Sequence, residues 1–481
     1  MLDALQFEQW MQRINEDIEF QGALDSASNY WKRYLHFDTR LKTDNLGKWQ
    51  HKLLDSNYVS RHAFYPFLRH EIIKKRFQSV TVQNPQGKRY KLRVKYKQKP
   101  TRPICYAAHQ DALIYAWYGF KLHQLLETQI TAAGISDCAI AYRPLERCNI
   151  HFAKEAFDFV KAQQSCVALA FDVTKFFDSL DHEIVKQSWC RLLGVSRLPD
   201  DHFTIYKSMT KFHFVRLELL KKELGEEEFE ARRQSGRLSY PKDFRERIVP
   251  LIETNKGKGI PQGAPLSAVL SNMYMFEADK ILSAFADSYG GYYRRYCDDL
   301  LFIVPISDEL EARRIMQETI AALNLQINDE KTEVCYFSPN SKTGNLICAD
   351  EYGKGTALQY LGLEFDGREI RLRPASLSRY HHRLRRNVRQ AARMAFGRNA
   401  YLDGKPAPKN GKILKRTLYE KYSSLGNRNF ITYARKAFKI TESQAIKRQC
   451  NQGVALVNRC VMAETARRKV RLREKLAKQT E

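Results

Sequence analysis

The stretch Tyr296-Cys297-Asp298-Asp299 places two adjacent carboxylates between segments that alternate or run apolar within residues 292–304. Such flanks are typical of the strands of a buried hairpin. Carboxylate oxygens are the ligands that Mg²⁺ prefers, and a turn is where two charged groups stay hydrated. The pattern therefore predicts a divalent-cation site at the turn of a hairpin, with a pair of solvated surface carboxylates as the alternative.

A second apolar run, residues 167–171, ends in another carboxylate, Asp172. Two strands would then deliver three carboxylates to one place. Asp172, Asp298 and Asp299 together are able to bridge two metal ions, one at an attacking 3′ hydroxyl and one at a triphosphate. Asp is also a favoured N-cap, so a further possible role for Asp172 is to cap a helix that begins near Thr174.

A Gly/Pro-rich loop with Pro261-Gln262-Gly263 at its centre lies between the two acidic segments and runs into an apolar helix. The order of an Asp strand followed by two Phe, this loop and Tyr-Cys-Asp-Asp resembles motifs A, B and C of reverse transcriptases. More segments resemble motifs of that family, in the same order: 99–104 and 141–144 resemble two fingers motifs, 325–332 resembles motif D, and 358–365 resembles the motif E primer grip. The resemblance covers roughly residues 95 to 370.

The resemblance implies a role for each matching residue. Asp172, Asp298 and the backbone carbonyl of Val173 are expected to ligate two Mg²⁺ ions, with Asp299 close by as a weaker ligand. The expected contacts to the dNTP substrate come from Lys99, Arg102 and Gln262, with Arg102 favoured over Lys99 for the triphosphate. Lys331 is expected to donate a proton to pyrophosphate, and Arg143 and Gly362 are expected to contact nucleic acid.

Phe177 stands five residues after Asp172, where the family places the aromatic side chain that excludes a 2′ hydroxyl. That position predicts a preference for dNTP over rNTP. A core side chain is the alternative role for Phe177. We expect the neighbouring Phe176 to take the core position, because neighbours on a strand face opposite ways.

The fold expected from the resemblance is α+β, a right-hand polymerase with fingers, a ferredoxin-like palm and an α-helical basic thumb. The ferredoxin-like palm consists of an antiparallel sheet plus helices. The expected boundaries follow the motifs: 1–90 an N-terminal helical fingers extension, 91–165 fingers, 166–370 palm with a charged helical insertion about 200–255, and 371–481 thumb.

The net charge of +26 is concentrated at the C-terminal end. Residues 371–481 contain 29 Lys and Arg against 6 Asp and Glu, a net +23. Such an excess predicts a polyanion partner, with a solvated face as the alternative. An apolar stripe at helical spacing indicates that this region is folded, and a second stripe consists of arginines that suit phosphates. The apolar stripe is Tyr380, Leu384, Val388, Ala391 and Ala395, and the arginine stripe is Arg379, Arg383, Arg386 and Arg393.

The ten cysteines form no CxxC pair, which argues against structural zinc and suits reduced thiols. We find neither a signal peptide nor an apolar run long enough to cross a membrane. These features predict a cytoplasmic protein with no membrane partner.

Within the group II intron and retron-like superfamily, the chain most resembles bacterial defence-associated reverse transcriptases of the class 2 type. It lacks the Val-Thr-Gly string that retron enzymes carry in the thumb. The resemblance implies antiphage defence, a companion structured noncoding RNA as template, concatenated cDNA, and an RNA–DNA duplex as product. The alternatives are a template-independent nucleotidyl transferase, a group II intron type maturase and a noncatalytic RNA-binding scaffold.

Overall fold

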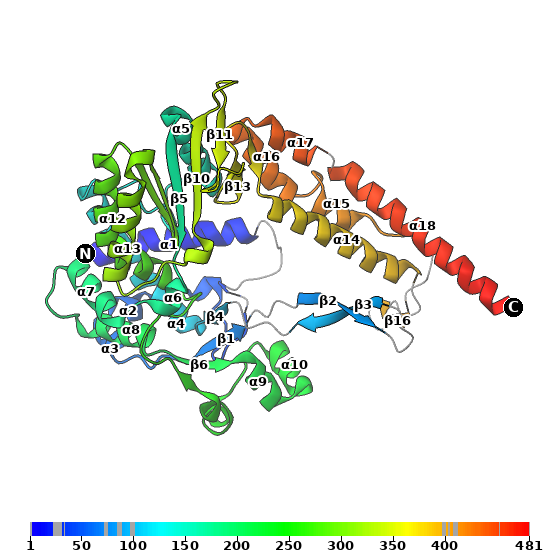
Figure 1. Cartoon of the computed structure of the whole chain (residues 1–481). Coiled ribbons are helices and arrows are strands. Elements are labelled where there is room, and N and C mark those ends of the chain that lie inside the picture. The colour runs from blue at the N-terminus through cyan, green and yellow to red at the C-terminus, as the bar shows by residue number, and fades with distance from the viewer. Residues whose placement is uncertain are drawn as a thin grey trace.

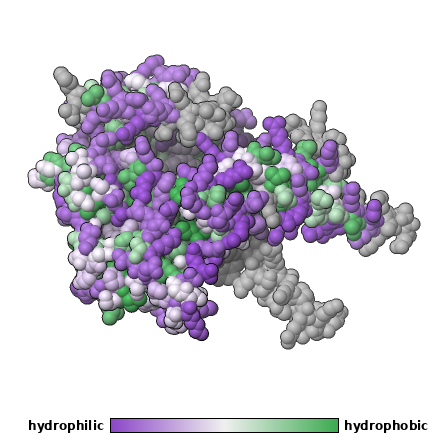
Figure 2. Space-filling view, turned by 90° about the horizontal axis from the view of Figure 1, so that it is seen from above, coloured by the Kyte–Doolittle hydropathy of each residue, from purple (hydrophilic) through white to green (hydrophobic). Residues whose placement is uncertain are grey.

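The computed structural model describes most of the chain. The described residues are 2–22, 31–32, 34–71, 76–83, 89–96, 102–396, 401–402, 405–406, 412–451 and 453–480. Lys99 therefore lies outside them. No helix within these ranges is both long and apolar enough to span a bilayer. Hydrophilic residues predominate on the face shown in Figure 2, with hydrophobic residues in small groups between them.

A five-stranded antiparallel sheet forms the centre of the molecule (Figure 1). Its strand order is β11-β10-β5-β9-β8, with bounds Leu346–Ala349, Glu333–Pro339, Cys166–Asp172, Asp299–Val304 and Tyr292–Tyr296. Strand β5 is buried on both faces because its alternating side chains enter two different cores. Val167 and Leu169 join the core beneath α12 (Ser267–Ser288), whereas Ala168 joins the core beneath α5 (Asn149–Gln163). Helices therefore cover both faces of the sheet, as an α+β palm requires.

A second sheet, of order β4-β1-β6-β7, combines distant parts of the chain. Its strands are Pro103–Tyr106, Phe67–Glu71, His213–Arg216 and Glu253–Thr254. Strand β6 of the expected insertion thus pairs parallel with β1 of the N-terminal region, and β7 pairs antiparallel with β6 at the edge of the sheet. The insertion is therefore packed into the sheet that contains β1 and β4 and does not form a separate domain. Its outer boundaries stay a prediction.

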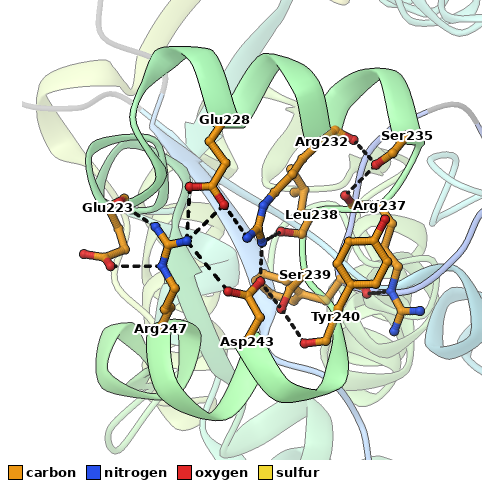
Figure 3. A network of polar contacts seen from close by, with 11 residues as sticks. Glu223, Glu228, Arg232, Ser235, Arg237, Leu238, Ser239, Tyr240, Asp243 and Arg247 are labelled. Carbon is orange, nitrogen blue, oxygen red and sulfur yellow. Dashed lines mark hydrogen bonds and ion pairs between the residues drawn. The ribbon is translucent and has the colours of Figure 1, made fainter.

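Charged side chains tie the helices of the insertion together (Figure 3). The chain forms α9 (Leu217–Leu224) and α10 (Glu226–Ser235), separated at Gly225, whose φ is 74°. Arg232 is ion-paired with Glu228 and Asp243, and Arg247 with Glu223 and Glu228. Beneath the helices, a small core joins leucines of α9 to β1, β6 and the N-terminal region: Leu220, Leu224, Leu68, Val215 and Phe37.

Buried polar pairs fasten the N-terminal region to the first turn of α4 (His109–Ala132). Nδ1 of His109 lies 2.7 Å from Oδ1 of Asp38, and Asp38 also accepts a hydrogen bond from Gln110 N. His62 binds Asp111 in the same way, at 2.7 Å. Both aspartates are almost fully buried. Burial raises the pKa of Asp111 to about 6, more than His62 lowers it.

The C-terminal region is helical and extends to one side of the palm (Figure 1). A three-stranded sheet connects it to the palm: β12 (Leu358–Tyr360), β13 (Leu363–Phe365) and β14 (Ile370–Leu372). The helices are α14 (Pro374–Phe396), α15 (Arg416–Tyr422), α16 (Phe430–Thr441), α17 (Gln444–Cys450) and α18 (Gly453–Thr480). The predicted apolar stripe is confirmed with one correction: Ala392, four residues after Val388, is buried in place of Ala391, as a period of 3.6 favours.

The remaining elements complete the fold. The helices are α1 (Leu2–Gly22), α2 (Gln50–Leu54), α3 (Ser56–Ser60), α6 (Phe176–Ser179), α7 (His182–Leu193), α8 (Asp200–Thr210), α11 (Pro241–Asp243) and α13 (Glu309–Ala322). Short 3₁₀ or π turns are η1 (Thr43–Asn45), η2 (Gly47–Trp49), η3 (Phe244–Ile248), η4 (Val249–Leu251), η5 (Ile306–Asp308) and η6 (Asp329–Lys331). Two hairpins pair β2 (Arg76–Gln83) with β3 (Arg89–Tyr96) and β15 (Tyr401–Leu402) with β16 (Lys405–Pro406).

Candidate active site

The two adjacent carboxylates lie at a tight turn between β8 and β9, as predicted. Tyr296 pairs with Asp299 across the hairpin, and the turn residue Cys297 has a φ of 61°. The backbone carbonyl of Asp298 accepts a hydrogen bond from Val173 N at 3.1 Å. The turn is thereby held against the end of β5.

Asp172 is the last residue of β5 and lies opposite Asp299 in the sheet register. Its side chain is bound by Lys331, whose Nζ lies 2.7 Å from Oδ2 of Asp172. The alternative in which Asp172 caps a helix near Thr174 is wrong, because α6 begins at Phe176. Motifs A, C and D therefore meet at one end of the sheet.

Asp299 is the most strongly perturbed of the three carboxylates. Burial, and after it the charges of Asp298 and Asp172, raise the pKa of Asp299 to about 6, although Arg102 and Arg373 act against the rise. Its side chain remains accessible to solvent, because it stands in a recess of about 460 Å³. The recess is also lined by Asp172, Lys331, Gly362 and Arg373. Burial is the main cause of the raised pKa, and the neighbouring charges of Asp298 and Asp172 add to it.

The carboxylates fit a hard cation by their chemistry, since oxygen donors that repel one another are stabilised by a divalent ion. In the described part of the chain, no three His, Cys, Asp or Glu side chains are arranged as a ready metal cage. The Lys331 ammonium group lies 2.7 Å from Oδ2 of Asp172, so a cation that binds this oxygen would have to displace it.

A buried arginine supports the turn from behind, and our sequence reasoning missed it. Arg295 is fully buried and binds Asp279 of α12 through Nε at 2.8 Å and Nη2 at 2.7 Å. Its Nη1 donates to the carbonyl of Cys297 and to Oδ1 of Asn272, each at 3.2 Å. Asn272 in turn donates to Ala141 O at 2.9 Å. The turn is thus tied to the helix that follows the Pro-Gln-Gly loop.

The Pro-Gln-Gly loop bridges β4 and the segment after Asp172. Cys105 N donates to Gln262 O at 2.7 Å, and Ile260 N donates to Phe177 O at 2.8 Å. Gly263 has a φ of 104°, and a Cβ there would lie 2.8 Å from Cys105 O. Only glycine suits this close approach. The Gln262 side chain is half-buried at this junction, and its contact with a nucleotide stays a prediction.

Phe176 and Phe177 differ in burial as expected, but for another reason. Both lie on α6 and not on a strand, so strand alternation does not apply. Phe176 is 2% exposed, and Phe177 is half-buried and packs against the same core. Their rings meet edge to face at 5.4 Å. The role of Phe177 in sugar selection stays a prediction.

The predicted nucleic-acid contacts fall into two groups. The Arg143 guanidinium binds Glu127 through two nitrogens at 2.7 Å and also donates to Ser136 O and Ala139 O, and its contact with nucleic acid stays a prediction. With only 2% of the side chain exposed, Arg143 fastens its own loop. Gly362 occupies the tip of the β12–β13 hairpin with a φ of 93°. The four thumb arginines 379, 383, 386 and 393 are all exposed on α14.

Comparison with known proteins shows similarity to one family of enzymes. Residues 201–365 match the family model described as reverse transcriptase (RNA-dependent DNA polymerase). The retron Mx162 reverse transcriptase of Myxococcus xanthus is 30% identical over 109 residues, covering 20% of this chain and 22% of that protein. The retron Ec86 reverse transcriptase of Escherichia coli is 35% identical over 100 residues, covering 20% of this chain and 31% of that protein. The matches thus span about a fifth to a third of these relatives.

Among solved structures, similarity extends to telomerases. Apo telomerase from Candida tropicalis, truncated from its C-terminal domain, is 14% identical, with a TM-score of 0.35 over 69% of this chain and 61% of that chain. Telomerase from Candida albicans with a telomeric RNA fragment is 11% identical, with a TM-score of 0.38 over 89% of this chain and 67% of that chain.

Both of these relatives are retron enzymes, although this chain lacks the Val-Thr-Gly string, and the class 2 subtype stays a prediction. Residues 201–365 thus match the reverse transcriptase family, and about a fifth of the chain is similar to bacterial retron reverse transcriptases.

Proposed function

We propose that the protein is an RNA-directed DNA polymerase. One observation carries the proposal: Asp172 and Asp299 lie in register on neighbouring strands, with Asp298 at the adjoining turn, inside a chain that matches the reverse transcriptase family. Nucleotidyl transfer needs anionic oxygen ligands at the reacting phosphate and basic groups around the triphosphate. The carboxylates supply the first requirement, and Arg102, whose charge reaches Asp299, supplies part of the second.

Each step of the reaction has a proposed residue. The primer 3′ hydroxyl would lose its proton to water and form a bond to the α-phosphorus of the dNTP, while the bond from that phosphorus to the β-phosphate oxygen breaks and pyrophosphate leaves with a proton from its donor. Asp172, Asp298, the carbonyl of Val173 and, more weakly, Asp299 would hold two Mg²⁺ ions, which supply charge neutralisation at the attacking and leaving oxygens. Lys331 is the proposed proton donor. We propose that the Lys331 ammonium group moves from the Asp172 carboxylate to the leaving pyrophosphate and protonates it, because both anions attract its positive charge.

Substrate selection falls to groups around the same recess. We propose that Phe177 packs under the sugar and excludes a 2′ hydroxyl, and that Gln262 contacts the nucleotide or the template base. Lys99 would assist Arg102 at the triphosphate. Gly362, at the tip of the β12–β13 hairpin, faces the recess and is the proposed contact with the primer strand.

The proposal also covers which nucleic acid is copied. The net charge of +23 over residues 371–481 supports an RNA or RNA–DNA partner for the thumb. We propose a companion noncoding RNA copied into concatenated cDNA, in antiphage defence of the class 2 type, in the bacterial cytoplasm. The proposed division is 1–90 and 91–165 for fingers, 166–370 for palm and 371–481 for thumb.

Primer extension tests the proposal. Purified protein is given Mg²⁺, dNTPs and an RNA template with a DNA primer, and in parallel the same mixture without template. Template-complementary DNA is the expected product. Product of unrelated sequence in both mixtures would show a template-independent transferase, and no product with intact RNA binding would show a scaffold. Sequencing the RNA and DNA that copurify identifies the template, and an excised intron among them would favour a maturase.

A further inference from the structure

A cavity of about 530 Å³ lies in the thumb, away from the carboxylates. It is bounded by α14, by α15 and by the chain that leads into α16. The residues that matter for its chemistry are Arg379, Tyr380, Arg383, Lys421, Arg428 and Phe430. Its volume falls within the roughly 300–1,000 Å³ that small-molecule sites occupy.

The aromatic part of the wall is held in place by packing and hydrogen bonds. The rings of Tyr380 and Phe430 stack at 4.8 Å with 24° between their planes. The Tyr380 hydroxyl donates to Tyr422 O at 2.7 Å, which fixes the ring on α15. Phe430 is only half-buried, so part of its ring is open to the cavity that it lines. A fixed, partly open ring is a stacking surface for a base.

The chain next to Phe430 is equally well fixed. The Asn429 side chain donates to Ser423 O at 2.7 Å and to Glu420 O at 2.9 Å. Its Oδ1 accepts hydrogen bonds from Ile431 N and Thr432 N, and so caps α16. The cavity is therefore pre-formed, and a ligand would bind without ordering its walls.

The charge of the cavity is positive. Four cationic side chains line it, whereas Glu420 is the sole acidic residue among the described residues of its wall. The Glu420 carboxylate is already paired with Arg416, at 3.0 Å. An anion is therefore the ligand that the charge favours. An anionic group beside an aromatic face is the chemistry of a nucleotide.

We propose that this thumb cavity binds one unpaired nucleotide of an RNA strand, with its phosphate at Arg379 and Arg383 and its base against Phe430. The inference rests on the proposed function for its RNA partner. A duplex offers its phosphates along a convex backbone and keeps its bases stacked inside, so it contacts exposed arginines but does not fill a cavity. Unstacked nucleotides of loops and ends are what proteins read on RNA. The thumb would then distinguish an unpaired strand from a duplex as well as bind phosphates.

Helix α14 provides a matched control. Arg386 and Arg393 are exposed on the same helix but do not line the cavity. Changing Arg379 and Arg383 to Gln, or Arg386 and Arg393 to Gln, removes the same charge. The probes are single-stranded RNAs of about six nucleotides and a blunt RNA duplex of about 12 base pairs, titrated by fluorescence anisotropy at several salt concentrations. Phe430→Leu keeps an apolar side chain but removes the flat ring.

We expect the change of the cavity pair to lower single-strand affinity on the order of tenfold relative to the control pair, because it removes charge-assisted hydrogen bonds. Both pairs should weaken duplex binding equally, with a salt slope flatter by roughly 0.7 to 0.9 for each phosphate that is no longer neutralised. Phe430→Leu should weaken single-strand binding alone. Equal weakening by both pairs on both probes, or a Phe430→Leu protein that binds single strands like wild type, would overturn the proposal.

Failure of this inference is distinguishable from failure of the proposed function. Primer extension by the wild-type protein on a generic template–primer depends on the palm and not on the cavity. A protein that polymerises but shows no difference between the two pairs refutes the cavity alone. A protein that does not polymerise but shows the difference refutes the polymerase alone.

Discussion

Nη2 of Arg295 lies 2.7 Å from Oδ2 of Asp279, and neither side chain is more than 2% exposed. The same guanidinium donates to the carbonyl of Cys297, one residue before the two carboxylates of the turn. The ion pair between Arg295 of β8 and Asp279 of α12 therefore supports the backbone of the candidate metal site.

Two variants separate the role of Arg295 in positioning the turn from its contribution to the stability of the fold. Arg295→Met leaves the buried Asp279 carboxylate without a counter-charge and with only the Tyr293 hydroxyl as a donor, at 2.9 Å. We expect this to cost about 3–5 kcal/mol of unfolding free energy and to lower kcat more than it raises KM. Arg295→Met with Asp279→Leu should recover most of the stability, because no charge is left buried alone, yet kcat should stay low because Cys297 O no longer has its donor. Urea unfolding and steady-state extension measure the two quantities. Recovery of kcat together with stability would reduce the pair to a purely structural role.

Changing both Asp298 and Asp299 to Ala should abolish dNTP incorporation, since phosphoryl transfer loses its metal ligands. RNA affinity should remain nearly unchanged, because the cationic residues of the thumb are untouched. The matched control changes two exposed acidic residues outside the proposed site and the insertion, Asp287 and Glu351, to Ala. Primer extension and RNA binding are measured on the same preparations, and appreciable synthesis by the Asp298/Asp299 variant would refute the assigned site.

Asp299→Asn tests the repulsion among the carboxylates through thermal stability. A carboxyl group whose pKa is raised to about 6 in the folded protein binds a proton more tightly there than in the unfolded chain. Its contribution to stability therefore falls as pH rises from about 4 to about 6 and stays unfavourable above that. We expect the variant to melt at a higher temperature than wild type at pH 8, with no gain at pH 4.

Addition of Mg²⁺ extends the same test. It should raise the Tm of wild type more than that of Asp299→Asn, because ligand binding to the folded state stabilises it. Asp287→Asn, an exposed change at the end of α12, is the control and should show neither effect. An unchanged Tm at pH 8 for Asp299→Asn would mean that neither burial nor the neighbouring charges destabilise the ionised Asp299 carboxylate.

The hairpin that carries Asp298 and Asp299 was predictable because its signal is local: alternating and apolar residues on both sides of a short acidic turn. Burial of Arg295 was not predictable from sequence. Its partner Asp279 lies 16 residues earlier on a helix, and a charged residue next to Arg294 in a strand reads as solvent-facing. A small signal was present, since Arg295 has the same strand parity as the buried Tyr293.

Arg143 and the thumb show two features that the sequence alone could not predict. A motif match placed Arg143 at nucleic acid, whereas the fold gives its guanidinium four protein contacts. The arginine stripe of α14 was readable from its spacing. The cavity that divides that stripe was not, because its other walls come from α15 and the chain before α16.

Phe177→Ala should admit rNTPs by removing the proposed wall under the sugar, with a smaller loss of dNTP incorporation than the Asp298/Asp299 change. Phe176→Ala is the contrast: it empties a position that is 2% exposed, and we expect it to cost roughly 3–5 kcal/mol of stability without a change in sugar selection. Single-nucleotide kinetics with dNTP and rNTP give the ratio for each. If the ratio for Phe177→Ala equals that of wild type, Phe177 belongs to the core alone.

The last prediction concerns α10, a ten-residue helix of the insertion that has no fully buried residue and packs only Phe229 partly against the small core. Replacing the whole of 217–235 would also remove Leu220 and Leu224 from the core shared with β1, so loss of folding would confuse the result. Replacing only 226–235 with a short Gly/Ser loop removes α10 and leaves α9 in place.

We propose that the insertion helps to choose the companion RNA, and therefore expect the α10 replacement to extend a generic template–primer at a rate near that of wild type. Its copurifying RNA should become more diverse, because general phosphate contacts carry no sequence information. Arg232→Gln with Arg247→Gln keeps the helix sequence otherwise intact while breaking the ion pairs that hold it (Figure 3), and it should produce the same shift if the placement of α10 matters. Sequencing of bound RNA measures both. Enrichment of the same single RNA in all three proteins would show that template choice lies elsewhere in the chain.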